Sequence, residues 1–273
     1  MPKIHPTAAV DPRARIAEDV EIGPGCVVEG DVEIGTGTIL RPHAVIRRYT
    51  SLGEGNFVDS GAVLGGDPQD LKFDPATVAY LRIGDGNTFR EGVTISRASK
   101  KGQATVVGSK TYWMATSHAG HDARIDDGAI LVNGALVAGH AHVGPRAFLS
   151  GHVVVHQFTL IGEGVMSQGH AGTSTHMPPF VLFAGINRVA GLNIVGLRRT
   201  PEVTPEDRRQ IQEAFRLTYR AGFSAAEALA RMDQCSDWGA PASRYREFIR
   251  RVVAAEKPYN RGLGRLRKGG SDD

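Results

Sequence analysis

Two histidines and an aspartate lie close together in residues 114–125, MATSHAGHDARI. His118 and His121 are three residues apart, and Asp122 follows the second histidine directly. A neutral imidazole can accept a proton from a substrate near neutral pH, and a neighbouring carboxylate can hold its tautomer. Three imidazoles that converge in a tetrahedral array would instead bind zinc. Which chemistry applies depends on what the fold places beside these residues.

A six-residue repeat organises most of the chain. Every sixth residue from Ile4 to Leu64 is aliphatic, and a second run from Ile83 to Ile161 is apolar except at Lys101. This period fits neither an amphipathic helix nor a simple alternating strand. It fits a short strand followed by a corner, with three sides closing one coil of 18 residues. The pattern therefore predicts an all-β parallel β-helix of triangular section, built from hexapeptide repeats, over residues 1–195.

Two segments interrupt the repeat. Residues 65–82, GGDPQDLKFDPATVAYLR, shift its phase by one residue, and residues 96–104 make a second, shorter excursion. We expect the first segment to project as a loop from one corner. Loops on rigid scaffolds often carry function, although a tolerated insertion would have the same pattern.

Helix signals replace the repeat near the C-terminus. Thr204 is suited to an N-cap before Pro205, and Ser224 with Glu227 forms a capping-box pattern. Four residues share one face of the first of these helices: Ile211, Ala214, Phe215 and Thr218. We predict a small α-helical domain over residues 196–273, with helices at about 205–222, 224–234 and 242–255.

The 18-residue coil predicts which residues meet in space. Residues 18 apart lie above one another, about 4.8 Å apart, so His121 lies next to Gly139 and Gly139 next to Gln157. A glycine leaves its backbone N–H open to a developing oxyanion. Beside this column lie His140 and His156, and His118 can approach across the corner. A separate column at another corner holds Thr116, Gly134, His152 and His170.

The clustered histidines permit three interpretations. They could be acid–base residues, with Asp122 orienting His121 if the corner conformation brings their side chains together. They could form a zinc site, as in trimeric carbonic anhydrases on this fold, or they could be surface residues at permissive corners. No serine or cysteine nucleophile pairs with a base, which favours direct transfer over a covalent intermediate.

Composition restricts the function classes. The net charge of +3 is weak support for nucleic-acid binding, and we expect none. The two cysteines are far apart, no signal-peptide core is present, and no run of about 18 apolar residues occurs. We expect a soluble cytoplasmic protein without stable membrane insertion. The basic stretch RGLGRLRKGG near the C-terminus is either solvated or docks an acidic partner.

Several motifs together resemble one family. SHAGHDARI, NGALVAGHAHVG, VVHQFTLIGEGVM, GDPQDLKF and LNIVGLRR occur in this order before a helical tail. This combination is similar to the UDP-N-acetylglucosamine acyltransferases that begin lipid A synthesis. The resemblance covers nearly the whole chain and implies a left-handed β-helix and a homotrimer with sites between subunits. It also implies transfer of a 3-hydroxyacyl chain from acyl carrier protein to the glucosamine 3-hydroxyl of the UDP-sugar, without a cofactor or metal.

The resemblance implies roles for individual residues. His121 matches the general base, Gly139 the oxyanion donor, and Gly169 the position that bounds the acyl groove. The remaining matches are substrate-binding: Gln69, Asp70, Lys72, His118, His140, His156, Gln157, Asn193 and Arg199. A cation such as Lys72 or Arg199 suits a phosphate.

The chain also departs from the family pattern. It has Ser96-Arg97-Ala98-Ser99 where the family usually has His-Arg-Gly-Thr, and Val195 replaces a glutamate. These changes leave open a 3-amino UDP-sugar acceptor, which would give an amide, and the sequence also leaves open acyl-CoA as donor. A sister N-acyltransferase is less consistent, because those enzymes usually carry an N-terminal uridine-binding domain and the repeat here starts at Ile4. A non-catalytic scaffold would explain neither the loop nor the histidines.

Overall fold

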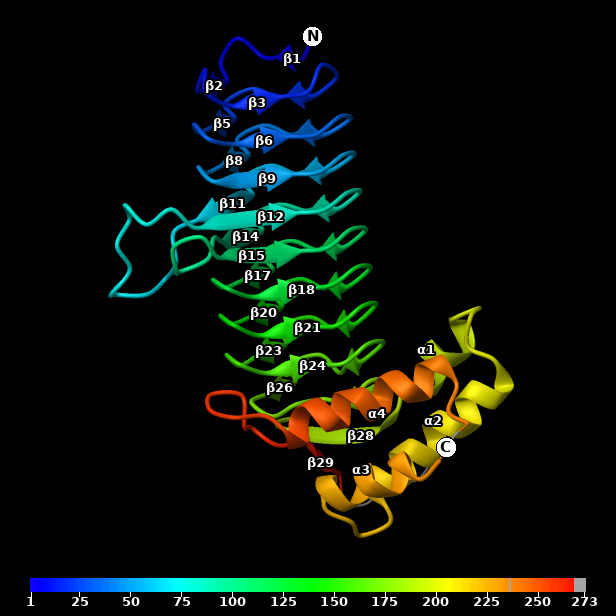
Figure 1. The fold of residues 1–273 in the computed structure, drawn as a ribbon. Coiled ribbons are helices and arrows are strands. Elements are labelled where there is room, and N and C mark those ends of the chain that lie inside the picture. Colours follow the sequence, from blue (N-terminus) through cyan, green and yellow to red (C-terminus); the bar gives the residue numbers. More distant parts are fainter. Residues whose placement is uncertain (236, 268–273) are drawn as a thin grey trace.

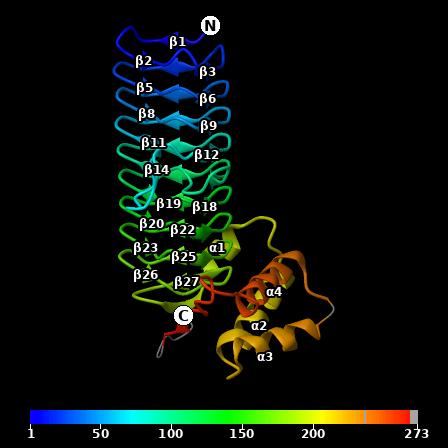
Figure 2. The ribbon, with the colours of Figure 1, turned by 60° about the vertical axis from the view of Figure 1, so that its left-hand side comes forward.

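The computed structural model describes residues 1–235 and 237–267, and it is a tall triangular prism of stacked coils with helices at its base (Figure 1). The coils are left-handed, because the front strands run to the right as the chain descends (Figure 1). Turning the molecule shows the same stack with the helices to one side (Figure 2). The predicted β-helix is therefore confirmed.

The described strands form three sheets, one on each face of the prism. The first sheet contains β1 (Lys3–Ile4), β4 (Glu21–Ile22), β7 (Ile39–Leu40), β10 (Phe57–Val58), β13 (Thr88–Phe89), β16 (Tyr112–Trp113), β19 (Ile130–Leu131), β22 (Phe148–Leu149), β25 (Met166–Ser167), β27 (Val181–Phe183), β28 (Arg188–Leu192) and β29 (Arg265–Leu266). The second contains β2 (Ala9–Val10), β5 (Val27–Val28), β8 (Val45–Ile46), β11 (Val63–Gly66), β14 (Thr94–Ser96), β17 (His118–Ala119), β20 (Leu136–Val137), β23 (Val154–Val155) and β26 (Gly172–Thr173). The third contains β3 (Arg15–Ile16), β6 (Glu33–Ile34), β9 (Thr50–Leu52), β12 (Tyr80–Ile83), β15 (Ala104–Val107), β18 (Arg124–Ile125), β21 (His142–Val143) and β24 (Leu160–Ile161).

The register follows the 18-residue coil except where the chain bulges. Ile4 pairs with Ile22, whereas Leu52 pairs with Ile83 and Ile83 with Val107, so two coils are longer. The second residue of most strands points inward and is buried, which makes one continuous apolar core along the prism. Burial of this column on folding supplies the main stabilising free energy.

Both interruptions leave the prism at one edge. The loop between β11 and β12 and the excursion between β14 and β15 each connect the second sheet to the third. We call this corner the loop edge, and the corner between the third and first sheets the helix edge. The loop projects far from the prism, as predicted (Figure 1).

Four helices lie in the described C-terminal part: α1 (Ile194–Arg199), α2 (Pro205–Tyr219), α3 (Ala225–Asp233) and α4 (Ala240–Val253). Thr204 caps α2 and the capping box at Ser224 opens α3, as predicted, and Thr204 also forms a capping box, with Asp207. The four residues predicted to share one face of α2 are all buried. The short helix α1 was not predicted, and the expected boundary at 195–196 falls inside it. The chain then returns to the sheet, where β29 pairs with β28.

No helix in residues 1–235 and 237–267 is both long and apolar enough to cross a membrane.

Candidate active site

The candidate catalytic residues lie at consecutive corners of the loop edge. His121 and Asp122 form the turn between β17 and β18, and Gly139 and His140 form the next turn, between β20 and β21. The His140 N–H donates to the His121 carbonyl oxygen at 3.0 Å, so the two corners are in direct contact. The stacking predicted from the coil length is therefore confirmed.

Asp122 holds one nitrogen of His121. Nδ1 of His121 lies 2.8 Å from Oδ2 of Asp122. Adjacent strand residues would point to opposite faces, but Asp122 has φ 60°, in the left-handed region, and the corner turns both side chains the same way. The expected carboxylate–imidazole pair is formed, and it leaves Nε2 of His121 for substrate.

Gly139 lies against the imidazole of His121. A Cβ built on Gly139 would be 3.0 Å from Cε1 and 3.1 Å from Nε2 of His121, so a larger residue would displace the ring. Within the part of the chain that the structure describes, the Gly139 N–H donates to no acceptor. The glycine thus combines a close approach to the base with an unused donor, which is what an oxyanion needs.

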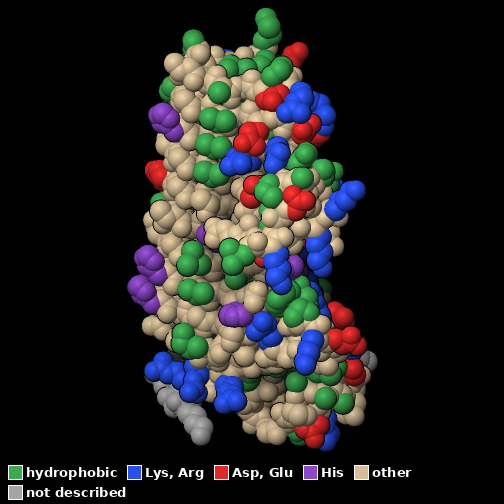
Figure 3. All heavy atoms as spheres, turned by 90° about the vertical axis from the view of Figure 1, so that its left-hand side faces the viewer, with side chains coloured by type: hydrophobic (Ala, Val, Ile, Leu, Met, Phe, Trp, Pro, Cys, Tyr) green, Lys and Arg blue, Asp and Glu red, His purple; other side chains and the backbone are tan. Residues whose placement is uncertain are grey.

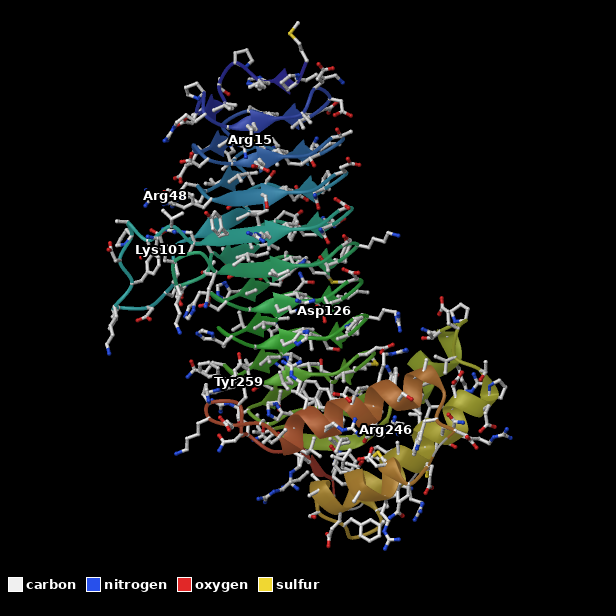
Figure 4. All side chains as sticks on the ribbon, in the orientation of Figure 1. Arg15, Arg48, Lys101, Asp126, Arg246 and Tyr259 are labelled. Carbon is white, nitrogen blue, oxygen red and sulfur yellow. The ribbon has the colours of Figure 1, made fainter. Side chains whose placement is uncertain are left out.

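An aromatic stack supports His140. Its ring packs edge-on against His121, with centroids 5.1 Å apart, and lies parallel to Phe158 at 4.6 Å. Tyr259 packs edge-on against Phe158, and its hydroxyl donates to the His140 carbonyl oxygen at 3.2 Å. Figure 4 shows Tyr259 reaching the same side of the prism as Arg48 and Lys101. The 18-residue coil predicts Phe158 beside His140, and the stack confirms it. Tyr259 was not predicted, because it comes from a distant segment without a motif.

The hydrogen bonds around Asp122 keep it ionised. Burial alone would raise the pKa of its carboxyl group, but bonds to His121 and Ser99, with the charge of His140, outweigh burial and lower it. Burial also lowers the pKa of His140 below its usual value, partly opposed by Asp122. The site therefore favours an ionised Asp122 carboxylate beside a neutral His140 imidazole.

The same groups could be considered as a metal site. His121, Asp122 and His140 offer ligand atoms within 4.8 Å of one another. Ligands of tetrahedral zinc are about 3.3 Å apart, given zinc–nitrogen bonds of about 2.0 Å. Here the His121–Asp122 distance is that of a hydrogen bond, and the same Asp122 oxygen accepts from the Ser99 hydroxyl at 2.6 Å. The carboxylate is thus engaged in hydrogen bonds, and the arrangement fits acid–base chemistry better than zinc binding.

Three further predicted residues lie along the second sheet and its loop-edge turns. His118 is on β17, where Nδ1 lies 2.8 Å from Oγ1 of Thr94, and burial lowers its pKa. His156 is exposed, and its Nδ1 contacts the backbone oxygen of Gln157 at 3.1 Å. His156 and Gln157 therefore share the edge with His121, but no hydrogen bond, ion pair or ring contact joins them to it in the described structure.

The loop residues Gln69, Asp70 and Lys72 are exposed at the tip of the projecting loop. The Lys72 N–H donates to Oδ1 of Asp70 at 3.0 Å, so the tip has a local turn. Leu71 between them is fully exposed. In the described chain the structure brings none of the three to His121.

Asn193 and Arg199 lie at the helix edge. Oδ1 of Asn193 accepts the Gly196 N–H at the start of α1, and its Nδ2 donates to the Gly164 carbonyl oxygen at 3.1 Å. Arg199 is exposed in the last turn of α1. Figure 1 shows α1 on the opposite side of the prism from the loop, so these residues and His121 are separated within one chain.

Gly169 lies at the third edge, between the first and second sheets. Its φ is not in the left-handed region, and a Cβ would meet only the Gly151 carbonyl oxygen, at an ordinary 3.7 Å. The backbone therefore does not require glycine here. The separate histidine column is also confirmed, since the rings of His152 and His170 stack at this edge with centroids 5.1 Å apart.

Comparisons with known proteins agree with this geometry. Residues 177–263 match the family described as UDP-N-acetylglucosamine O-acyltransferase, domain 2, and residues 2–48 match bacterial transferase hexapeptide repeats. The acyl-[acyl-carrier-protein]–UDP-N-acetylglucosamine O-acyltransferase of Anaeromyxobacter sp. is 41% identical over 232 residues, covering 84% of this chain and 90% of that protein.

Solved structures agree over nearly the whole length. The UDP-N-acetylglucosamine O-acyltransferase of Moraxella catarrhalis is 33% identical with a TM-score of 0.88, covering 96% of this chain and 99% of that one. The UDP-N-acetylglucosamine acyltransferase of Bacteroides fragilis is 34% identical with a TM-score of 0.87, covering 95% and 99%. The chain belongs to the acyl-[acyl-carrier-protein]–UDP-N-acetylglucosamine O-acyltransferase family.

Proposed function

We propose that this chain transfers a 3-hydroxyacyl group from acyl carrier protein to the 3-hydroxyl of UDP-N-acetylglucosamine, the first step of lipid A biosynthesis. The observation that carries this proposal is the position of His121 between the Asp122 carboxylate and the bare Gly139 amide. Family membership supplies the substrate class, and it gives no support to the zinc lyase alternative.

The geometry supports a direct transfer. Nε2 of His121 removes the proton of the sugar 3-hydroxyl while its oxygen attacks the thioester carbonyl carbon. The carbonyl oxygen becomes an oxyanion and accepts the Gly139 N–H. Collapse breaks the carbon–sulfur bond, and the leaving thiolate takes the proton from the His121 imidazolium. Asp122 stabilises that imidazolium through Nδ1, so the enzyme ends in its starting state.

A homotrimer explains why the predicted site residues are divided between two edges. In a three-fold ring the first-sheet face of one copy meets the second-sheet face of the next. The loop edge of one copy then lies beside the helix edge of its neighbour. His121 from one copy would thus face Asn193 and Arg199 from another.

The outward side chains of the sheets support this assembly. The second sheet presents a mostly apolar row, which Figure 3 shows as a column of hydrophobic side chains: Ala9, Val27, Val45, Val63, Thr94, His118, Leu136 and Val154. The first sheet begins with the ion pair of Lys3 and Glu21, and from the third coil on it presents a mostly apolar row: Ile39, Phe57, Thr88, Tyr112, Ile130, Phe148 and Met166. The third sheet instead presents charged residues, among them Arg15, Glu33, Arg82 and Arg124. Two largely apolar faces and one charged, solvent-exposed face are suited to a closed ring of three copies.

The interface also offers a path for the acyl chain. The apolar second-sheet face runs from His121 at the loop edge toward Gly169 at the third edge. Since the backbone does not need glycine at position 169, the missing side chain is better explained by a ligand that occupies the space. We infer that Gly169 borders the acyl groove and that a side chain there would shorten it.

The carrier protein would dock on the basic C-terminal part of the chain. Arg188 and Arg267 line one surface hollow near the base of the prism, and Arg265 lies on the neighbouring β29. Lys268 of the predicted basic tail lies outside the described residues. Cations here would steer an acidic carrier mainly by raising its rate of association.

Two departures from the family pattern make the identity of the acceptor sugar the point to test. Ser96 is buried, and Val195 is exposed on α1 where the family pattern has a carboxylate. Purified protein should be assayed with 3-hydroxyacyl carrier protein and either UDP-N-acetylglucosamine or its 3-amino analogue, with product identified by mass spectrometry. We expect ester formation with the first acceptor. Preferential amide formation would replace that acceptor, and no transfer to either would overturn the proposal. A parallel assay uses acyl-CoA in place of the acylated carrier protein as donor. Metal analysis of the purified protein tests the zinc alternative.

A further inference from the structure

The excursion at the loop edge contacts both the projecting loop and the catalytic pair. It follows β14. Along the chain, its residues 97–99 come after the projecting loop and before His121. The Arg97 N–H donates to the Gly66 carbonyl oxygen at 2.8 Å, and the Ala98 N–H donates to the Tyr80 carbonyl oxygen at 3.0 Å. The backbone of this segment therefore fixes both ends of the loop.

The Arg97 side chain fixes the interior of the loop. It has no exposed surface, and its guanidinium donates to the Asp67 carboxylate at 3.0 Å, to the Pro75 carbonyl oxygen at 3.1 Å and to the Thr77 carbonyl oxygen. Its guanidinium carbon lies 5.4 Å from the ring centroid of Tyr49 and 5.0 Å from that of Phe73. A buried arginine is retained only when such partners satisfy it.

These contacts leave only the tip of the loop free. The segment between Asp67 and Phe73 is anchored at both of its ends, and it carries the exposed residues Gln69, Asp70, Leu71 and Lys72. A short segment held at two points keeps few conformations, so little entropy is lost when it binds a ligand. Arg97 thus sets the position of residues that do not themselves touch it.

Ser99, two residues after Arg97, holds the catalytic carboxylate. Its hydroxyl donates to Oδ2 of Asp122 at 2.6 Å, and its N–H lies 3.2 Å from the same oxygen. That oxygen also accepts from His121, so Ser99 and His121 share one acceptor. Removing the Ser99 hydroxyl would remove one cause of the lowered Asp122 pKa and let the carboxylate turn away from the imidazole.

We propose that residues 97–99 are one positioning segment that sets the substrate loop through Arg97 and the His121–Asp122 pair through Ser99. The proposal rests on the acyl transfer proposed above and adds two positioning residues to it. The two residues act on different steps: Arg97 on binding, and Ser99 on proton transfer. The chain has serine where the family pattern has threonine, which keeps the hydroxyl that this role requires.

The Ser99 part is tested with Ser99→Ala and Ser99→Thr. We expect Ser99→Ala to lower kcat about tenfold near pH 7, with KM little changed, and to move the acidic limb of the kcat/KM profile, because the pairing of Asp122 with His121 changes. Ser99→Thr should restore both. Lys101→Ala, an exposed change in the same excursion, is the control. Wild-type kcat and an unmoved limb for Ser99→Ala would overturn this part.

The Arg97 part is tested with Arg97→Lys, which keeps the charge but loses the planar set of donors. We expect KM to rise about tenfold or more with the pH profile unchanged, and limited proteolysis to cleave within residues 67–79 faster than in wild type. Unchanged KM and unchanged cleavage would overturn it.

Two measurements need no substrate and separate this inference from the proposed function. Histidine ¹⁵N NMR reports whether Nδ1 of His121 keeps its proton in Ser99→Ala, and proteolysis reports the loop in Arg97→Lys. If the wild-type protein transfers no acyl group, the proposed function fails, while these two readouts still decide whether residues 97–99 position the pair and the loop.

Discussion

The loop edge and the helix edge are built from the same type of corner, but they use different residues at its left-handed position. Along the helix edge this position is glycine in many coils: Gly37, Gly55, Gly86, Gly128 and Gly164. Along the loop edge the ordinary coils carry side chains there: Asp31, Tyr49, Asp122, His140 and Phe158. A non-glycine residue in this conformation costs about 1–2 kcal/mol. Each of these five loop-edge residues therefore carries this backbone strain.

The difference indicates where side chains are needed. Asp122, His140 and Phe158 form the carboxylate and the aromatic support around His121, and Tyr49 packs against the guanidinium of Arg97. Backbone strain is often concentrated at functional sites, where the surrounding structure holds it in place. The helix edge instead supplies its predicted ligands from α1, outside the coils. The loop edge of one copy would perform the chemistry, and the helix edge of a neighbouring copy would bind the substrate.

The largest effect is expected from removing the base at the loop edge. His121→Ala should lower kcat about 10²–10⁴-fold, the usual contribution of a general base. The assembly should stay intact by size-exclusion chromatography, because the imidazole contributes no core packing. His5→Ala, an exposed histidine at the N-terminus, is the control. Activity within about tenfold of wild type would assign the base elsewhere.

A second experiment separates the two edges directly. His121→Ala and Arg199→Ala chains, carrying different tags, are co-expressed so that they assemble together. If each site takes His121 from one copy and Arg199 from the next, about a quarter of the sites in randomly mixed trimers are intact, so activity recovers toward that fraction of wild type. Recovery is impossible if both residues act within one chain. Mixed assemblies no more active than the better single variant would therefore reject the divided site.

Much of this comparison could be predicted from the sequence. The 18-residue coil placed His121 beside Gly139 and identified both interruptions, because the inward column depends only on hydrophobic periodicity. The pairing of Asp122 with His121 could only be stated as a condition, since it depends on a left-handed turn that periodicity does not specify. The sequence does contain a signal of functional corners: aspartate, histidine or phenylalanine occupies a turn position that is often glycine elsewhere.

Other parts could not be predicted for definite physical reasons. Arg97 and Ser99 lie in an excursion without periodicity, so coil arithmetic assigns them no neighbours, and an arginine is expected to be exposed. Tyr259 reaches Phe158 through tertiary contacts across more than one hundred residues. The helix α1 is too short for a hydrophobic pattern to emerge, and its Asn193 cap resembles an ordinary turn residue.

The smallest expected effect concerns the third edge, which neither performs the chemistry nor binds the nucleotide in this proposal. Gly169→Met should preserve the fold, because the nearest atom to a Cβ there is at van der Waals distance. It should lower kcat/KM for the longest accepted acyl chain about tenfold or more while sparing chains a few carbons shorter, since each buried methylene contributes about 0.8 kcal/mol. Gly191→Met is the matched control, because nothing lies within 4 Å of a Cβ built on Gly191. An equal loss for all chain lengths would mean that Gly169 affects the assembly rather than the groove. A selective loss would show that the face joining the third edge to the loop edge receives the acyl chain.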